Sequence, residues 1–239
     1  MGSQCPGWNP IGANTICAGN FKNLNTAPPS MIGITVHNRW MTLGGEWVQG
    51  SLQSADTIIN WARQYNYTGV DFDMEGALSG KDDEVNTLMG ELKKNGMHTQ
   101  ATVFGSTGFA NADKWTNADT IALMLYGNNM GDTSIGCTKA GPWNWCIPTN
   151  ATAESPTGST WNYIKQWIDS PSIPNNKIIL AATAYTDGGL QSYMIDFYKG
   201  LVKKYNLGGV LYWPGNASRP SSQCWLKSGF NGSTTNCKS

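Results

Sequence analysis

Residues 69–76 read Gly-Val-Asp-Phe-Asp-Met-Glu-Gly, a short stretch in which Asp71, Asp73 and Glu75 alternate with apolar residues. Successive side chains of a β-strand point to opposite faces, so this alternation predicts a strand with all three carboxylates on one face. In a parallel barrel, the apolar face of such a strand packs against the surrounding helices and the acidic face points inward. The stretch therefore favours a barrel strand whose interior face is acidic.

Three carboxylates on one strand face are costly, because like charges repel and desolvation raises the pKa of each acid. One interpretation is an acidic strand end that faces solvent. A second is a calcium site, although calcium prefers oxygen ligands from a curved loop to those of a straight strand. The third, which we favour, is a proton-sharing cluster that keeps Glu75 protonated near neutral pH and able to act as a general acid.

Short apolar stretches alternate with longer amphipathic ones on both sides of this segment. The predicted strands are 31–37, 39–43, 69–74, 99–104, 120–126, 177–185 and 208–213, and the predicted helices are 55–65, 82–95, 161–168 and 191–205. Strands that alternate with helices indicate βαβ units and a parallel sheet. The sequence lacks the glycine-rich motifs Gly-x-Gly-x-x-Gly and Gly-x-x-x-x-Gly-Lys-Ser/Thr, which disfavours a nucleotide-binding doubly wound sheet.

A single α/β domain over residues 1–239, a (β/α)8 TIM-type barrel, fits this alternation and the length of 239 residues. Residues 1–30 are rich in Gly, Pro and Asn and are predicted to form an irregular segment held by a disulfide, with Thr15–Ala18 as one further candidate strand. The leading 37 residues are too few for two full βα units. We therefore expect a barrel that is shortened or truncated at its N-terminal strands.

The charge balance excludes some classes of partner. The chain has 16 Lys and Arg against 16 Asp and Glu, so its formal net charge is zero. A nucleic-acid-binding protein needs a basic surface to displace counterions from phosphate, and docking on an anionic membrane needs one as well. No apolar run approaches the roughly 20 residues that a membrane span requires. We expect no nucleic-acid partner and no membrane span.

The six cysteines fall into three local pairs, which indicates disulfides that staple loops and termini. The alternative is zinc, but no Cys-x-x-Cys occurs and His37 and His98 lie far from any cysteine. We therefore predict no metal site and no cofactor, and assign neither histidine a role. The predicted bridges join Cys5 to Cys17, Cys137 to Cys146 and Cys224 to Cys237.

Four Asn-x-Ser/Thr sequons begin at Asn66, Asn150, Asn216 and Asn231. Such sequons are the acceptor sites for N-glycans in secreted proteins. Together with the paired cysteines they favour a secreted or extracellular glycoprotein.

The acidic stretch resembles the signature of family 18 glycoside hydrolases, the chitinases and endo-β-N-acetylglucosaminidases, Asp-Gly-x-Asp-x-Asp-x-Glu at the end of barrel strand four. Residues 68–75 match it except at the first position, which is Thr68. Residues 42–45, Thr-Leu-Gly-Gly, resemble the Ser-x-Gly-Gly signature of strand three. Residues 124–127 resemble Met-x-Tyr-Asp of strand six, and residues 209–213 resemble Gly-x-Met-x-Trp of strand eight. Four matches in the correct order are fairly specific.

The resemblance implies a role for each matching residue. Glu75 would protonate the glycosidic oxygen, and the 2-acetamido oxygen of the substrate would be the nucleophile, an exception to the use of two catalytic carboxylates. Asp73 would hydrogen-bond the acetamido N–H, and Asp71 would share a proton with Asp73. Tyr126 would hold the acetamido carbonyl for attack, and Trp213 would form the apolar floor under the sugar.

Further substrate-binding residues are expected in the loops that follow strands, where barrel enzymes build their sites. Gly44 and Gly45 belong to the strand-three signature, and Asn128 is a candidate replacement for the strand-six Asp, which is Gly127 here. Tryptophans expected in such loops are Trp47, Trp115, Trp143 and Trp145, and the strongest candidates for sugar contact are Trp143 and Trp145.

The function that the resemblance implies is a secreted retaining hydrolase of β-1,4-linked N-acetylglucosamine, in chitin or in the chitobiose core of N-glycans. An alternative is a catalytically weak or inactive chitinase-like protein that binds a glycan as a lectin. Fold alone does not decide between them. Glu75 favours the enzyme, whereas Gly127 favours the lectin.

Overall fold

The computed structural model describes residues 4–8, 14–20, 38–43, 52–64, 66–75, 78–104, 112–125, 147–148, 150–183 and 192–213. For the described residues before Leu43 only the backbone is described. Leu43 is the first residue whose side chain is described as well, and it is buried.

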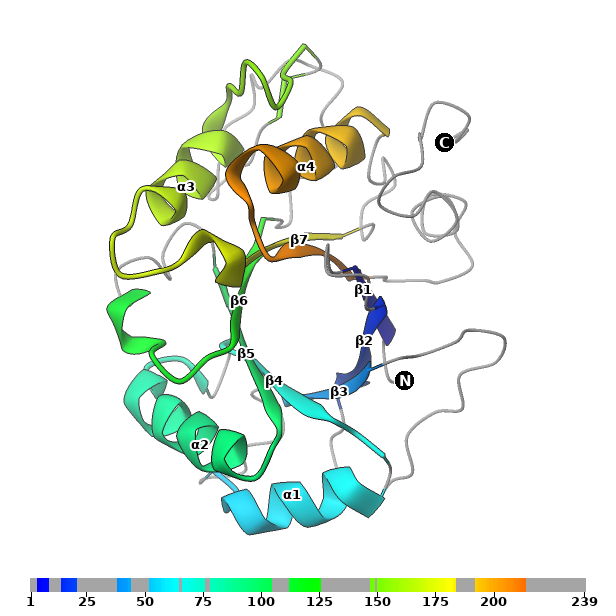
Figure 1. The fold of residues 1–239 in the computed structure, drawn as a ribbon, viewed down its shortest axis with the longest axis vertical. Coiled ribbons are helices and arrows are strands. Elements are labelled where there is room, and N and C mark those ends of the chain that lie inside the picture. Colours follow the sequence, from blue (N-terminus) through cyan, green and yellow to red (C-terminus); the bar gives the residue numbers. More distant parts are fainter. Residues whose placement is uncertain are drawn as a thin grey trace.

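Eight strands of the described residues form a closed barrel in chain order (Figure 1). They are β1 (Gln4–Trp8), β2 (Asn14–Asn20), β3 (Asn38–Leu43), β4 (Gly69–Asp73), β5 (His98–Phe104), β6 (Thr120–Met124), β7 (Ile178–Thr183) and β8 (Gly209–Trp213). Strands β2 to β8 pair in parallel with their neighbours. Strand β1 is antiparallel to both β2 and β8 and closes the ring. The predicted α/β barrel is thus confirmed, with a hairpin where a regular barrel has a first βα unit.

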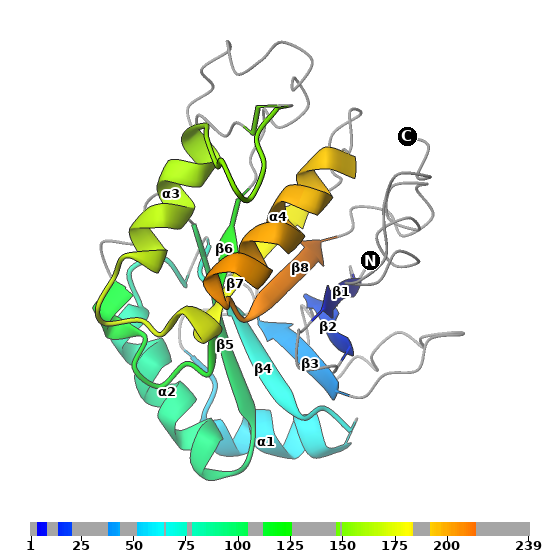
Figure 2. The ribbon, with the colours of Figure 1, turned by 45° about the horizontal axis from the view of Figure 1, so that its top comes forward.

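The helices of the described residues are α1 (Ala55–Gln64), α2 (Asp82–Lys94), α3 (Ser159–Ile168) and α4 (Ser192–Tyr205), with a short 3-10 helix, η5 (Asn175–Lys177), before β7. They lie outside the ring of strands (Figure 2). Each of the four α-helices forms because apolar residues recur at helical spacing and give it one buried face. In α2 that face is Val85, Leu88, Met89 and Leu92.

Most predicted elements agree with the structure to within a few residues, but the N-terminal segment differs. The prediction of irregular structure in residues 1–30 is wrong for β1, whereas the further candidate strand Thr15–Ala18 lies within β2 and is confirmed. Pro6 and Gly7 both lower strand propensity, and for this reason the local sequence did not predict β1. The structure accommodates them in a strand that pairs antiparallel with β2 on one side and with β8 on the other. The predicted strand over 31–37 lies outside the described residues.

The described core has two parts. The larger one fills the space between the strands and the helices and includes Val70, Phe72 and Met74 of the acidic segment. The smaller one lies on the β6, β7 and β8 side and consists of Ala122, Ile179, Ala181 and Leu211.

Buried polar side chains gather instead on β4, β5 and the start of β6. Four of them are Asp71, Gln100, Thr102 and Thr120, and a fifth, Thr99, points the other way from β5, toward Asn117. Because facing residues alternate along each strand, these four share the interior face of the barrel with the smaller core.

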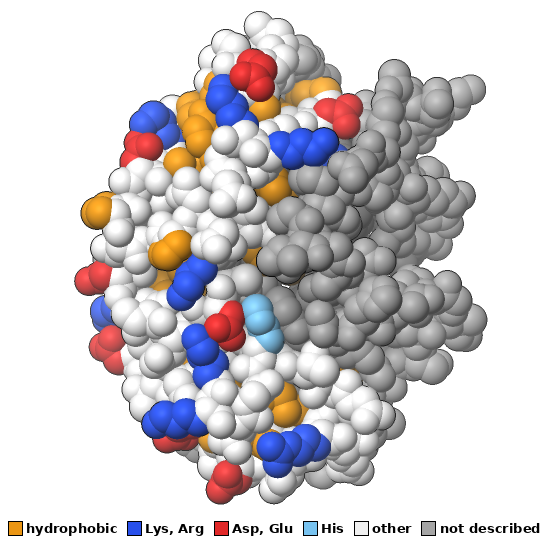
Figure 3. Space-filling view, in the orientation of Figure 1, with side chains coloured by type: hydrophobic (Ala, Val, Ile, Leu, Met, Phe, Trp, Pro, Cys, Tyr) orange, Lys and Arg blue, Asp and Glu red, His pale blue; other side chains and the backbone are white. Residues whose placement is uncertain are grey.

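On the face seen in Figure 3, the described part carries acidic and basic side chains interspersed. Within the described residues, no helix combines the length and the apolar character needed to cross a membrane.

Candidate active site

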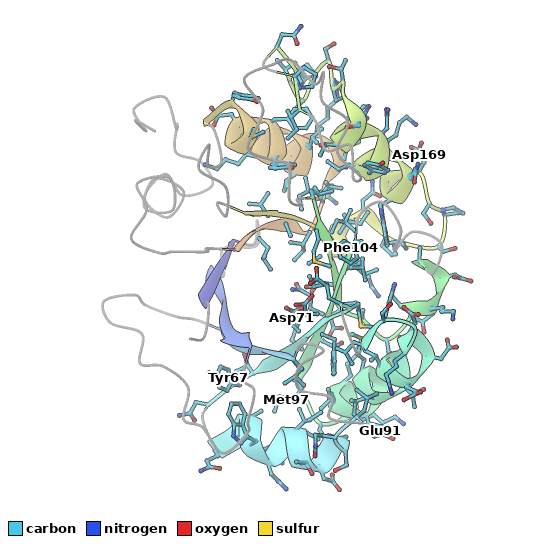
Figure 4. The ribbon with its side chains drawn as sticks, turned by 180° about the vertical axis from the view of Figure 1, so that it is seen from behind. Tyr67, Asp71, Glu91, Met97, Phe104 and Asp169 are labelled. Atoms are coloured by element: carbon cyan, nitrogen blue, oxygen red, sulfur yellow. The ribbon has the colours of Figure 1, made fainter. Side chains whose placement is uncertain are left out.

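The three carboxylates of the acidic segment lie along β4 and at its carboxyl end. Asp71 is only 2% exposed, within the ring of strands (Figure 4). Asp73 is the last residue of β4, and Glu75 follows it in a tight turn in which the Glu75 N–H donates to the Asp73 carbonyl over 2.7 Å. The intervening Val70, Phe72 and Met74 are buried in the outer core. The predicted alternation of acidic and apolar faces is therefore confirmed.

Asp71 is held by two side chains of the next strand. Its Oδ1 accepts a hydrogen bond from the Thr102 hydroxyl at 2.6 Å and another from the Gln100 amide Nε2 at 3.1 Å. Hydrogen bonds to a carboxylate favour its ionised form. Asp71 is thus the member of the cluster that the fold prepares to carry a negative charge.

Asp73 differs in its surroundings. Its Oδ1 is buried and has no hydrogen-bond partner among the described residues. Burial, and then the negative charges of Glu75 and Asp71, raise the pKa of Asp73 from 3.8 to about 8. Near neutral pH this carboxyl group is therefore mostly protonated, with one oxygen left for a further partner.

Glu75 lies beyond the end of β4, where it is partly exposed. Burial raises its pKa above the ordinary value for a glutamate. From the sequence, a protonated Glu75 was explained by proton sharing within the cluster. In the structure the pKa of Glu75 is raised by burial, and the larger rise in pKa is that of Asp73. A half-exposed acid at the rim is placed to give a proton to a ligand that enters from this end.

Trp213 ends β8 and pairs in register with Thr183 of β7, as Asp73 ends β4 and pairs with Thr102 of β5. Carboxyl ends of parallel strands meet at the same end of a barrel. The backbone of Trp213 therefore lies at the same end of the barrel as the acidic cluster.

Several predicted residues lie outside the described part of the chain. They are Gly44, Gly45, Tyr126, Asn128, Trp143 and Trp145, and the cysteines Cys137, Cys146, Cys224 and Cys237. One other prediction is corrected. Trp115 is 3% exposed and belongs to the core, so it is unavailable to a sugar. His98, to which the sequence assigned no role, has its Nδ1 3.8 Å from Asp119 Oδ2.

The sequence analysis also missed the polar face of β5. His98, Gln100 and Thr102 alternate with Thr99, Ala101 and Val103, the same period-two pattern as in β4. This alternation of polar and apolar residues was the signal in the sequence that could have indicated the polar face. Among the described side chains, no group of three or more His, Cys, Asp or Glu is arranged to hold a metal ion.

No family model and no curated relative matches this sequence. Solved structures do match. A chitinase from Chromobacterium violaceum superposes with a TM-score of 0.55 at 14% identity, over 89% of each chain. The putative sporulation-specific glycosylase YdhD of Bacillus subtilis superposes with a TM-score of 0.52 at 11% identity, over 88% of this chain and 96% of that one.

Human YKL-39, crystallised in the presence of chitooligosaccharides, superposes with a TM-score of 0.51 at 12% identity, over 74% of this chain and 73% of that one. At such low identity the likeness concerns the fold. The chain therefore has the barrel fold of the chitinases and chitinase-like proteins, which confirms at the level of fold the resemblance to family 18 glycoside hydrolases.

Proposed function

We propose that this protein is a retaining glycoside hydrolase that cleaves β-1,4-linked N-acetylglucosamine by substrate-assisted catalysis. The observation that carries the proposal is the pair of carboxylic acids at the carboxyl end of β4 whose pKa values are both raised, that of Asp73 to about 8 and that of Glu75 above its ordinary value by burial. Carboxylic acids kept neutral near pH 7 are the groups that acid catalysis of glycosidic bond cleavage requires.

In this mechanism Glu75 donates its proton to the glycosidic oxygen as the bond from that oxygen to C1 breaks. The acetamido carbonyl oxygen of the same sugar attacks C1 and forms a cyclic oxazolinium ion. Asp73 hydrogen-bonds the acetamido N–H and stabilises the positive charge that develops there. Water then attacks C1 and returns a proton to Glu75, so that the configuration at C1 is retained.

Trp213 supports the same proposal by its place at this end of the barrel. We assign it the apolar floor of the sugar site, with Tyr126 as the residue that orients the acetamido carbonyl. The substrate is an oligosaccharide or polysaccharide that contains N-acetylglucosamine, and the fold likeness to YKL-39, which was crystallised with such oligosaccharides, is consistent with that class. We further propose that the protein is secreted, which the sequons at exposed Asn66 and Asn150 support.

The test compares the wild type with Glu75→Gln on chitooligosaccharides and on a high-mannose glycoprotein. The amide keeps the shape of the side chain but cannot donate the acid proton, so hydrolysis falls by about 10²–10⁴-fold while binding is largely kept. Glu91→Gln, a change of an exposed glutamate on α2, is the matched control and leaves the rate unchanged. Turnover of Glu75→Gln at the wild-type rate would reject Glu75 as the acid.

A second function is a chitinase-like lectin, which Gly127 favours, because it replaces the strand-six Asp that helps to hold the acetamido group in the family it resembles. Wild-type protein that binds chitooligosaccharides and releases no product from either substrate would support the lectin and contradict the hydrolase.

A further inference from the structure

A chain of hydrogen bonds crosses the barrel interior behind the acidic cluster. It begins at His98, at the start of β5, whose Nε2 lies 3.1 Å from the Thr120 hydroxyl. The Thr120 hydroxyl donates to Gln100 Oε1 at 3.0 Å, and Gln100 Nε2 donates to Asp71 Oδ1 at 3.1 Å. Thr102 adds a second donor to the same carboxylate oxygen at 2.6 Å.

The direction of this chain follows from the chemistry of its members. The Thr120 hydroxyl has one hydrogen, which it gives to Gln100, so its oxygen accepts from His98 Nε2–H. The Gln100 amide then presents its N–H to Asp71. Every bond donates toward Asp71, and donors arranged in sequence polarise one another in a buried environment.

We propose that Gln100 and Thr102 are positioning residues of the active site, which hold Asp71 as a fixed anion and so leave the shared proton on Asp73. Neither residue reaches the substrate; both act through Asp71. The proposal deepens the hydrolase function and rests on it for the kinetic part of its test.

Packing supports a positioning role beyond simple space filling. Gln100 is fully buried, and both its amide N–H and its amide oxygen have partners. A flipped Gln100 amide would place its oxygen against the Asp71 carboxylate, where two acceptors repel. The amide orientation and the negative charge on Asp71 therefore stabilise each other.

The described titratable groups around this chain are few. Asp73 and Glu75 lie on the β4 side. The negative charges of Glu75 and Asp71 raise the pKa of Asp73, because a second negative charge close by is unfavourable. His98 and Asp119 lie at the other end, where Lys93 of α2 pairs with Asp119 at 2.8 Å. Thr102 and Gln100 both donate to Asp71 Oδ1, so β5 supplies two side-chain donors to this carboxylate.

The test compares Thr102→Val with Thr99→Val. Both changes replace a buried threonine of β5 with an isostere, but Thr99 faces outward, where its hydroxyl donates to the Asn117 carbonyl at 2.9 Å. Loss of the Thr102 donor raises the pKa of Asp71, so the acidic limb of the kcat/KM profile moves up by about one pH unit. Thr99→Val leaves the limb in place, and Thr102→Ser restores it.

A second readout is independent of activity. A carboxyl ¹³C NMR titration of the aspartates, with the Asp71 signal assigned from Asp71→Asn, shows the same upward shift of the Asp71 pKa in Thr102→Val. If Thr102→Val does not fold, Gln100→Met removes the other donor and is measured in the same way.

The outcomes separate the two proposals. A wild type without hydrolysis overturns the hydrolase function, while the titration still tests the positioning role. An Asp71 titration that is equal in Thr102→Val and Thr99→Val overturns the positioning role, whatever the activity of the wild type.

Discussion

Gln100 of β5 lies directly opposite Asp71 of β4 in the barrel register, and its amide donates to the Asp71 carboxylate over 3.1 Å. Within the acidic cluster, Asp71 is thus the carboxylate that side-chain donors stabilise as an anion. Asp73, two residues further along the same face, has a buried oxygen without a partner among the described residues. The neighbouring strand thus decides which of two chemically identical side chains keeps the proton.

The raised pKa of Asp73 predicts that this residue destabilises the fold near neutral pH. Its pKa is about 8 in the folded protein against an ordinary 3.8, so the folded state binds more protons between these values. Stability therefore falls as pH rises through this window. Asp73→Asn, a neutral isostere, raises the free energy of unfolding at pH 7 by about 2 kcal/mol or more.

Chemical denaturation at several pH values measures this effect. Asp113→Asn, a change of an exposed aspartate, is the control and leaves the pH dependence as in the wild type. An Asp73→Asn variant no more stable than the wild type at pH 7 would contradict the raised pKa.

His98 gives the free energy of unfolding the opposite dependence on pH. Burial, with a smaller contribution from the positive charge of Lys93 and only partly opposed by Asp119, lowers the pKa of His98 from 6.5 to about 4. The unfolded state then binds more protons between these values, so this residue makes stability rise with pH from about 4 to 6.5. His98→Gln removes that rise while keeping a side chain able to hydrogen-bond Thr120.

In the wild type, the fall in stability caused by Asp73 and the rise caused by His98 offset each other between about pH 4 and 6.5. In His98→Gln, stability falls with pH over the whole window because only the effect of Asp73 remains. In Asp73→Asn, stability rises with pH because only the effect of His98 remains. Identical pH dependence of unfolding in His98→Gln and the wild type would mean that the histidine is not kept neutral by the fold.

The barrel and its acidic strand were predictable because each rests on local periodicity. The alternation over residues 69–75 gave both the strand and the inward face of its carboxylates. The role of Gln100 was not predictable in this way, because Gln100 and Asp71 are 29 positions apart and only the strand register brings them together. Strand β1 was missed for a related reason, since Pro6 and Gly7 oppose a strand locally and only pairing with β2 and β8 overrides them.

The register of the N-terminal hairpin supports one predicted disulfide. Cys5 of β1 lies directly opposite Cys17 of β2 in this antiparallel pair. Residues opposite each other in such a pair have Cα atoms about 4.5–5.5 Å apart, within the range that a disulfide spans. We expect a Cys5–Cys17 bridge, with local bridges Cys137–Cys146 and Cys224–Cys237, and peptide mapping without reduction detects them. A bridge between two of these groups would contradict the prediction.

The remaining prediction concerns which sequons carry a glycan. Asn66 is exposed in the turn before β4, at the end of the barrel opposite the acidic cluster, and Asn150 is exposed as well. Asn216 lies outside the described residues and follows the end of β8 by three positions in the sequence, so we expect a glycan there to crowd a substrate at the carboxyl ends of the strands. In a eukaryotic host we expect higher occupancy at Asn66 or Asn150 than at Asn216, measured by mass spectrometry of glycopeptides. Thr68→Ala and Thr152→Ala remove the first two sequons, keep both asparagines and identify their peptides. Full occupancy of Asn216 in a protein that still hydrolyses chitooligosaccharides would show that the substrate does not enter beside the end of β8.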